Sequence, residues 1–363
     1  PVGRFARFWA VNNLALLYAT SGEHGKAEPL YQRALTIQEQ ALGPEHPQVG
    51  LVVFNLAELY RKTNAFTKAE PMYRRALAIR EKALGPDHSD VAITLNNLAL
   101  LYTTSGEYRK AEPLYQRALA INERALGLTH PSVALSLNNL AELYRTTGQY
   151  AKAEPLYQRA LTINEQALGP MHPSVAMNLN NLGAVLQTMG DSAGARPFYE
   201  RALKINEQAL GPTHPSVALN LSSLAGLLLF TGDYAEGQRL YERALKIQER
   251  ALGPMHPAVA TSLFNLGAGL VAIGDYAGAL PLLERALKIQ EQALGPTHPD
   301  VAKTLSILGA LLVGAEDYAG ARPLFERALK IQEQALGPAH PDVAMSLMSL
   351  AILLHTTGDY AGA

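Results

Sequence analysis

The chain has 363 residues, a formal net charge of −1, and a composition that is 48% hydrophobic and 17% charged. This balance is typical of a folded chain, shows no basic excess for nucleic-acid binding, and includes no apolar run of about 20 residues that could span a bilayer. We therefore expect neither a nucleic-acid nor a membrane partner. The lack of cysteine excludes disulfides and thiolate metal sites and fits a cytoplasmic location, while the 22 prolines are unexpected because proline interrupts helices.

The first nine residues are irregular, and a repeat then runs to the end of the chain. The phrase Ala-Leu-Gly-Pro-x-His-Pro, with small variations, returns every 42 residues. Its copies begin at Ala41, Ala83, Ala125, Ala167, Ala209, Ala251, Ala293 and Ala335. Self-similarity at a fixed period of about 20–50 residues is typical of a solenoid, in which each repeat packs only against its neighbours.

One repeat predicts two helices. Apolar residues recur at helical spacing over residues 133–144 and again over residues 150–168. Gly148 separates the two segments, Pro131 suits the first turn of a helix, and Gly169 stands where a left-handed C-terminal cap is expected. Pro155 lies inside the second segment, so we expect it to remove one backbone hydrogen bond and bend that helix. The unit is therefore a helix hairpin, and no segment has the pattern of a strand.

Eight of the ten histidines occupy the same position (phase) in successive repeats, directly before a predicted first helix. They are His46, His88, His130, His172, His214, His256, His298 and His340. Equivalent residues of neighbouring hairpins lie about 8–10 Å apart, too far for three or four imidazoles to converge on one metal ion. We therefore expect these histidines to hold the turn or the helix start. Arg159 and its equivalents in other repeats indicate either solvated faces or ion pairs between repeats.

The two halves of the chain differ. The tyrosines Tyr18, Tyr60, Tyr102 and Tyr144 are replaced at the same phase by Leu186, Leu228, Leu270, Leu312 and Leu354. Loop aspartates appear only in the second half, at Asp191, Asp233, Asp275, Asp317 and Asp359. The last predicted helix runs from Asp342 to about Thr357. Neither end has a clear polar cap, which favours a fragment of a longer polypeptide or, alternatively, ends that stack on other molecules.

The repeat resembles the tetratricopeptide repeat. Residues Asn139-Leu140-Ala141, Tyr144, Gly148, Tyr150, Ala153, Tyr157 and Ala160 match that family's spacing, from residue 12 to residue 363. The 42-residue period and the Gly-Pro-x-His-Pro phrase resemble the kinesin light chain subtype, which also occurs in bacteria beside signalling ATPase or protease-like domains. The resemblance implies an all-α, right-handed α-solenoid of antiparallel helix hairpins, with about eight units and a partial ninth. We expect residues 1–363 to form one continuous solenoid.

The resemblance also implies that the first helices line a concave, peptide-binding groove. The polar candidates are Asn55, Asn96, Asn97, Asn138, Asn139, Asn180, Asn181, Glu58, Arg61, Glu142 and Arg145. The asparagines could clamp the backbone of a peptide or could satisfy hydrogen bonds between helices, and each Glu–Arg pair could select a ligand or pair internally. In the second half the groove turns apolar, with Leu229, Phe264, Val271 and Val313 as candidate contacts.

These features predict a non-enzymatic scaffold that binds a protein or peptide. The phosphate-loop, nucleophile-elbow and HExxH motifs are absent, and a strict repeat offers no unique catalytic pocket. We expect no metal and no cofactor. The alternatives are the sensor arm of a larger signalling protein, either a STAND-type ATPase or a caspase-like protease, and a structural array that self-associates through its uncapped ends.

Overall fold

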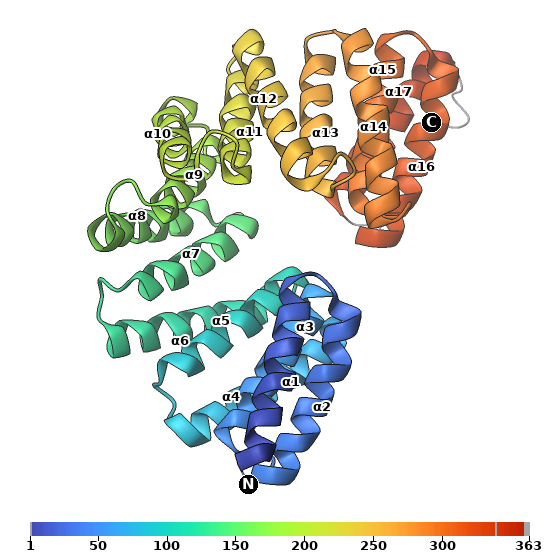
Figure 1. Cartoon of the computed structure of the whole chain (residues 1–363). Helices are drawn as coiled ribbons and strands as arrows, with labels where there is room; N and C mark the ends of the chain where they lie inside the picture. The colour runs from blue at the N-terminus through green and yellow to red at the C-terminus, as the bar shows by residue number, and fades with distance from the viewer. Residues whose placement is uncertain (1, 338–339, 359–363) are drawn as a thin grey trace. The chain divides into compact units, whose positions relative to one another are not determined.

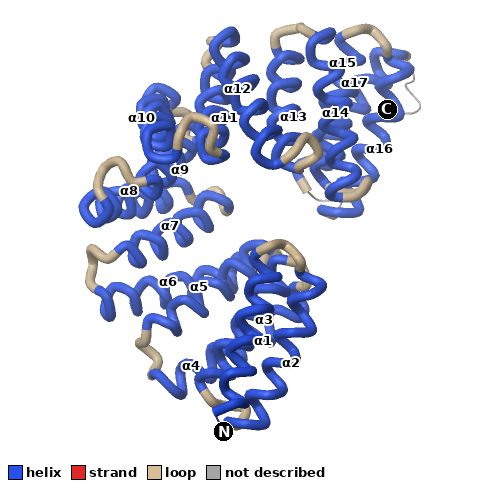
Figure 2. Tube along the Cα trace, in the orientation of Figure 1, coloured by secondary structure: helices blue, strands red, loops and turns tan. Residues whose placement is uncertain are grey.

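The computed structural model describes residues 2–337 and 340–358, and over these residues it is built from helices with no strand (Figures 1 and 2). The helices are α1 Val2–Thr20, α2 His24–Leu42, α3 Pro47–Lys62, α4 Phe66–Leu84, α5 Ser89–Thr104, α6 Tyr108–Leu126, α7 Pro131–Thr146, α8 Tyr150–Leu168, α9 Pro173–Thr188, α10 Ser192–Leu210, α11 Pro215–Phe230, α12 Tyr234–Leu252, α13 Pro257–Ala272, α14 Tyr276–Leu294, α15 Pro299–Gly314, α16 Tyr318–Leu336 and α17 Pro341–Thr357. The predicted all-α fold and its hairpin unit are confirmed. Pro155 lies inside α8 without ending it.

The chain divides into two compact units, residues 1–185 (unit 1) and residues 186–363 (unit 2), with the boundary inside α9. Within each unit, an odd-numbered first helix packs against the even-numbered second helix that follows it, and that second helix packs against the next first helix. A typical core cluster contains Val133, Ala134 and Leu137 of α7 with Ala160 and Ile163 of α8. Other clusters join the same pairs of neighbouring helices, whereas one in unit 2 runs continuously from Ala225 of α11 to Leu311 of α15. The core therefore repeats with the hairpins and is continuous over part of unit 2.

From α4 onward, a buried polar pair joins each second helix to the next first helix. In unit 1, Asn122 Nδ2 donates to Ser136 Oγ at 2.9 Å and Asn164 Nδ2 donates to Asn178 Oδ1 at 2.8 Å. Arg80 replaces asparagine at this phase and donates to Thr94 Oγ1 at 2.7 Å. The unit 2 pairs are Asn206–Asn220, Gln248–Ser262, Gln290–Thr304 and Gln332–Ser346, at 2.5–2.7 Å. A buried polar group that loses its partner is costly, so these pairs fix the stacking register.

The repeated histidines begin the first helices, as expected. The Nδ1 atom of each accepts a hydrogen bond from the backbone N–H two residues later, at 3.1–3.2 Å in all eight cases. This bond satisfies one of the N–H groups that the first turn of a helix leaves without a partner. It also requires a ring whose Nδ1 atom carries no proton.

The glycines that end the second helices differ in part from the expectation. Gly169 has φ +88°, which favours glycine as predicted, but its ψ is 153° rather than the value of the left-handed helix. This combination of angles is almost exclusive to glycine, because a side chain would clash with the backbone. The chain therefore leaves the helix in an extended direction, toward the histidine that begins the next one.

Ion pairs connect successive second helices at their exposed edges. An arginine pairs with the glutamate 36 residues earlier, for example Arg159 with Glu123 at 2.6 Å. The equivalent pairs are Arg75–Glu39, Arg117–Glu81, Arg243–Glu207, Arg285–Glu249 and Arg327–Glu291, at 2.5–2.7 Å. Of the two roles that the sequence left open for these arginines, the distances match ion pairs between repeats. Each pair is partly exposed, so its own contribution to stability is small.

Three of the four described aspartates at this position in unit 2 cap a second helix and require glycine three residues later. Asp275 accepts a hydrogen bond from the Gly278 N–H at 3.0 Å, and an added Cβ at Gly278 would lie 2.6 Å from Asp275 Oδ2. Asp191 and Asp317 cap Gly194 and Gly320 in the same way. Asp233 makes no such bond, and its helix carries Glu236 where the others carry glycine. The second half of the sequence therefore uses an Asp–Gly cap that the first half lacks.

The histidine caps predict a selective effect on stability. His130→Ala removes the acceptor for the Ser132 N–H and should lower the free energy of unfolding by about 1 kcal/mol. His130→Asn keeps a capping acceptor and should remain close to the unsubstituted protein. Urea unfolding followed by circular dichroism measures both, and equal losses in the two variants would contradict the capping role.

The aspartate caps predict a difference between two otherwise equivalent positions. Asp275→Ala should lower the free energy of unfolding by about 1 kcal/mol, because a capping hydrogen bond is lost. Asp233→Ala is the matched control, since it loses only the weaker interaction of a carboxylate with the helix dipole. Thermal unfolding of the two variants compares them directly. The interpretation fails if Asp233→Ala is as destabilising as Asp275→Ala.

Candidate functional site

One face of the first helices of unit 1 carries an exposed apolar row and a row of amides. The apolar row consists of Ile93 of α5, Leu135 of α7 and Met177 of α9, which are 46%, 54% and 46% exposed. Four residues after each of them stands an asparagine, and residues four apart share one face of a helix. With the equivalent residue of α3, the amide row is Asn55, Asn97, Asn139 and Asn181.

The amide row is half-buried and makes no hydrogen bond through its side chains within residues 2–337 and 340–358. Each amide offers an N–H₂ donor and a carbonyl acceptor. Beside an exposed apolar side chain, such a group can bind the backbone of a ligand while the apolar neighbour holds one of its side chains. For these four positions the arrangement favours the clamp over the structural alternative.

The asparagines one position earlier lie elsewhere, and two of them match the second alternative, hydrogen bonds between helices. Asn96 and Asn138 are only 8% and 5% exposed. Asn96 Nδ2 donates to Ser136 Oγ at 3.3 Å, and Asn138 Oδ1 accepts from Asn178 Nδ2 at 3.0 Å. One residue along a helix turns a side chain by about 100°, which carries this phase into the interface between first helices. Asn180, at the same phase, is half-buried, and we leave all three out of the proposed surface.

The two Glu–Arg pairs are held internally, together with a buried tyrosine. Arg61 donates to Glu58 at 3.0 Å, and Arg145 binds both carboxylate oxygens of Glu142, at 2.6 and 2.8 Å. Tyr73 Oη donates to Glu58, and Tyr157 Oη donates to Glu142 at 2.8 Å. These contacts give the pairs a fixed geometry, as the internal alternative anticipated.

The charge of Glu142 is stabilised by this geometry. Burial by itself would raise the pKa of Glu142, but the hydrogen bonds from Arg145 and Tyr157 outweigh it and bring the pKa below its usual value. Between the two Glu–Arg pairs, α5 carries Leu100 and Thr103 instead, and burial raises the pKa of Tyr115 to about 12. The pairs thus lie two repeats apart, on α3 and α7.

The apolar candidates of unit 2 pack into its core. Leu229, Phe264 and Val271 are partly buried against a cluster that includes Leu266 and Leu270. Val313 is partly buried against Phe325 and Leu353. Leu229 fills the space beside two glycines, Gly237 and Gly269, where an added Cβ would approach it closely. All four side chains are half-buried, so each packs in part within the repeats and keeps part of its surface exposed.

Ile93 and Met177 of the apolar row were not singled out in the sequence analysis. The signal that could have identified them is their place four residues before an amide-row asparagine. Over the described parts of the chain, no group of three His, Asp or Glu side chains is arranged to hold a metal ion, and no helix is long and apolar enough to cross a membrane.

This architecture defines an all-α repeat protein of the solenoid class, built from helix hairpins with a row of half-buried amides. The sequence matches the family described as Tetratricopeptide repeat at residues 7–82, 53–124, 90–166, 132–208, 174–236, 216–292, 269–334 and 300–363. The chain belongs to the tetratricopeptide repeat family.

Solved structures of the same kind are similar to this chain. BtubC (BKLC) from P. vanneervenii is 27% identical with a TM-score of 0.52, over 64% of this chain and 91% of that one. A putative kinesin light chain of Podosopora anserina with nearly identical TPR-like repeats is 27% identical with a TM-score of 0.50, over 57% and 99%. A STAND protein with a tetratricopeptide repeat sensor from Pyrococcus horikoshii shares the fold at 17% identity and a TM-score of 0.59, over 96% and 50%. The search of curated proteins gave no match.

The buried and half-buried asparagines predict opposite responses to alanine. Asn178→Ala removes the partner of both Asn164 and Asn138 and should lower the free energy of unfolding by about 1–3 kcal/mol, because buried polar groups lose their hydrogen bonds. Asn181→Ala, three residues later on the same helix, should change it by less than about 0.5 kcal/mol. Urea titration of the two variants tests the assignment, which is wrong if Asn181→Ala proves the more destabilising.

Proposed function

We propose that this chain is a protein-binding scaffold that holds an extended peptide on the first helices of unit 1. The observation that carries the proposal is the amide row, whose four side chains make no hydrogen bond within the described residues. Three of the four stand beside an exposed apolar residue of the same helix. Tetratricopeptide repeats are typically non-catalytic binding folds, and we assign this chain no reaction.

The amide row favours an extended ligand over a helical one. The backbone groups of a helix bond to one another, so an asparagine amide finds few backbone partners there. An extended chain leaves N–H and C=O groups free. In polyproline II geometry it presents every third side chain on one face, at about 9 Å, which matches the spacing of about 8–10 Å between packed helices. The preferred ligand is therefore an extended segment with an apolar side chain at every third position.

The proposal can be tested with peptides selected on the purified chain from a random display library. The dissociation constant of a selected peptide should rise about fivefold or more for Asn139→Ala, and more still for Leu135→Asp, because a hydrogen bond and an apolar contact are lost. The same fluorescence-anisotropy titration gives both values.

Unit 2 offers matched controls for this experiment. Asn265 and Leu219 occupy the phases of Asn139 and Leu135, and Leu219 is also exposed. Asn265→Ala and Leu219→Asp should leave the dissociation constant unchanged. The proposal is abandoned if selected peptides bind the unit 1 variants as tightly as they bind the unsubstituted chain.

A further inference from the structure

Second helices of unit 1 carry a side-chain pair that binds a tyrosine hydroxyl. In α6, Glu112 accepts a hydrogen bond from Tyr144 Oη at 2.8 Å, while Gln116 Nε2 donates to the same oxygen at 3.3 Å. In α2, Glu28 and Gln32 bind Tyr60 Oη at 2.9 and 3.3 Å. In α4, Glu70 and Arg74 do the same for Tyr102. The pair is spaced four residues apart, so both side chains reach one hydroxyl.

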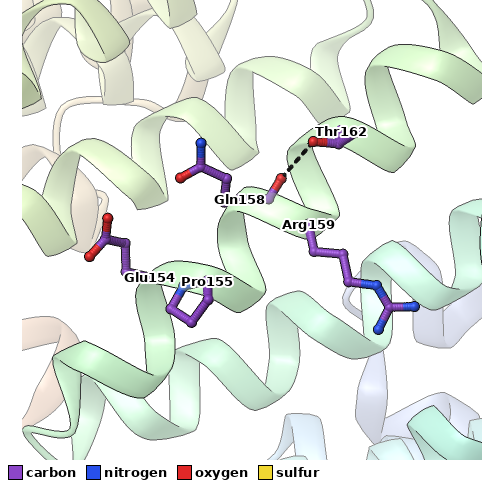
Figure 3. A pocket seen from close by; sticks show the side chains of 5 residues that line it. All are labelled: Glu154, Pro155, Gln158, Arg159 and Thr162. Atoms are coloured by element: carbon purple, nitrogen blue, oxygen red, sulfur yellow. Dashed lines mark hydrogen bonds between the residues drawn. The ribbon is translucent and has the colours of Figure 1, made fainter.

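Helix α8 carries the same pair at the same phase, Glu154 and Gln158, but the sequence has Leu186 at the tyrosine phase that follows. Within the described part of the chain, neither of these two side chains has a hydrogen-bond partner. They line a shallow depression of about 480 Å³ together with Pro155, Arg159 and Thr162. Figure 3 shows Glu154 and Gln158 projecting to the same side of α8, with Arg159 turned away.

In unit 2, where leucine also stands at the tyrosine position, the side chains at the two positions of the pair are different. At the two phases of the pair, Arg196 bonds to Glu200 at 2.7 Å, Gln238 to Glu242 at 3.0 Å, and Arg322 to Glu326 at 2.8 Å. In these helices the order of the two residues is reversed and they bond to each other. The hydroxyl-binding pairs also bond internally, since Gln32 donates to Glu28 and Gln116 donates to Glu112, both at 3.2 Å. Glu154 and Gln158 keep the order of those pairs, with the carboxylate first, so α8 retains both groups that bind a hydroxyl in α2 and α6.

The chemistry of the pair selects its ligand. A carboxylate only accepts hydrogen bonds, and the N–H₂ group of glutamine only donates. A hydroxyl satisfies both at once, whereas an ammonium group only donates and a carboxylate only accepts. Because Tyr60 and Tyr144 fill the equivalent sites, the phenol of tyrosine is the group whose fit this protein already demonstrates. We propose that Glu154 and Gln158 bind the side-chain hydroxyl of a tyrosine that belongs to a partner protein.

This site lies on a second helix and is independent of the amide row, so either proposal can fail alone. N-acetyl-tyrosinamide, added at millimolar concentration to the isotope-labelled full chain, should shift the side-chain amide resonance of Gln158 in a saturable way. N-acetyl-phenylalaninamide, which lacks only the hydroxyl, should bind at least about tenfold more weakly, as expected when a hydrogen bond to a charged group is lost.

Two matched variants separate binding from folding. Glu154→Ala should abolish the shift at Gln158 and leave the melting temperature unchanged, because the Glu154 carboxylate has no hydrogen-bond partner among the described residues. Glu112→Ala should lower the melting temperature, because it removes the partner of Tyr144, yet leave the Gln158 shift intact.

Three outcomes would overturn the proposal. The first is that the tyrosine and phenylalanine amides shift Gln158 equally or that neither shifts it. The second is that N-acetyl-lysinamide binds more tightly than the tyrosine amide, which would identify a cation site. The third is a tyrosine-dependent shift that persists in Glu154→Ala.

Discussion

The buried hydrogen bond between a second helix and the next first helix is the interaction on which the rest of the structure depends. A helix hairpin cannot bury its apolar face alone, so every repeat relies on its neighbours for a core. Apolar packing of alanine, valine and leucine is not directional and would tolerate small slips. A pair such as Asn164 and Asn178 does not, because a slip leaves two buried amides without partners. The register of the first helices, and with it the alignment of the apolar and amide rows, follows from these bonds.

The two units hold their helices together with different side-chain interactions. In α3, α5 and α7 of unit 1 a tyrosine is held by a glutamate, and a lysine from the following second helix lies over its ring, as Lys152 lies over Tyr144 at 5.1 Å. In unit 2 leucine replaces the tyrosine, and three of the second helices are fixed by an aspartate that caps a glycine. The exchange removes polar groups from one surface and adds them at the helix starts. Helix α8 lies where one arrangement gives way to the other. It carries the hydroxyl-binding Glu–Gln pair of unit 1, but the first helix that follows it has leucine at the tyrosine position, as in unit 2.

Much of the fold could be predicted because glycine, proline and histidine mark every helix boundary. Gly148, Gly169 and Pro131 locate the ends of one hairpin, and the repeat extends the prediction along the chain. The histidine caps and the arginine–glutamate pairs were also predictable, since their types and spacing leave few roles. The site was harder. Asn138 and Asn139 are adjacent and recur equally well, yet one is buried and the other half-exposed, and only the packing of neighbouring first helices decides between them. The same limit applies to Leu229, which sequence alone places on a first-helix face and which packing against Gly237 and Gly269 draws inward.

The central claim is that the amide row of unit 1 binds the backbone of an extended ligand while the buried asparagines hold the fold. Nuclear magnetic resonance on the isotope-labelled chain, saturated with a selected peptide, tests it most directly. The side-chain amide resonances of Asn97, Asn139 and Asn181 should shift, with intermolecular contacts from the peptide to the Leu135 methyl groups, while the resonances of Asn164 and Asn178 stay in place. Contacts that map to the second helices instead, with the Asn97, Asn139 and Asn181 amides unmoved, would contradict the account.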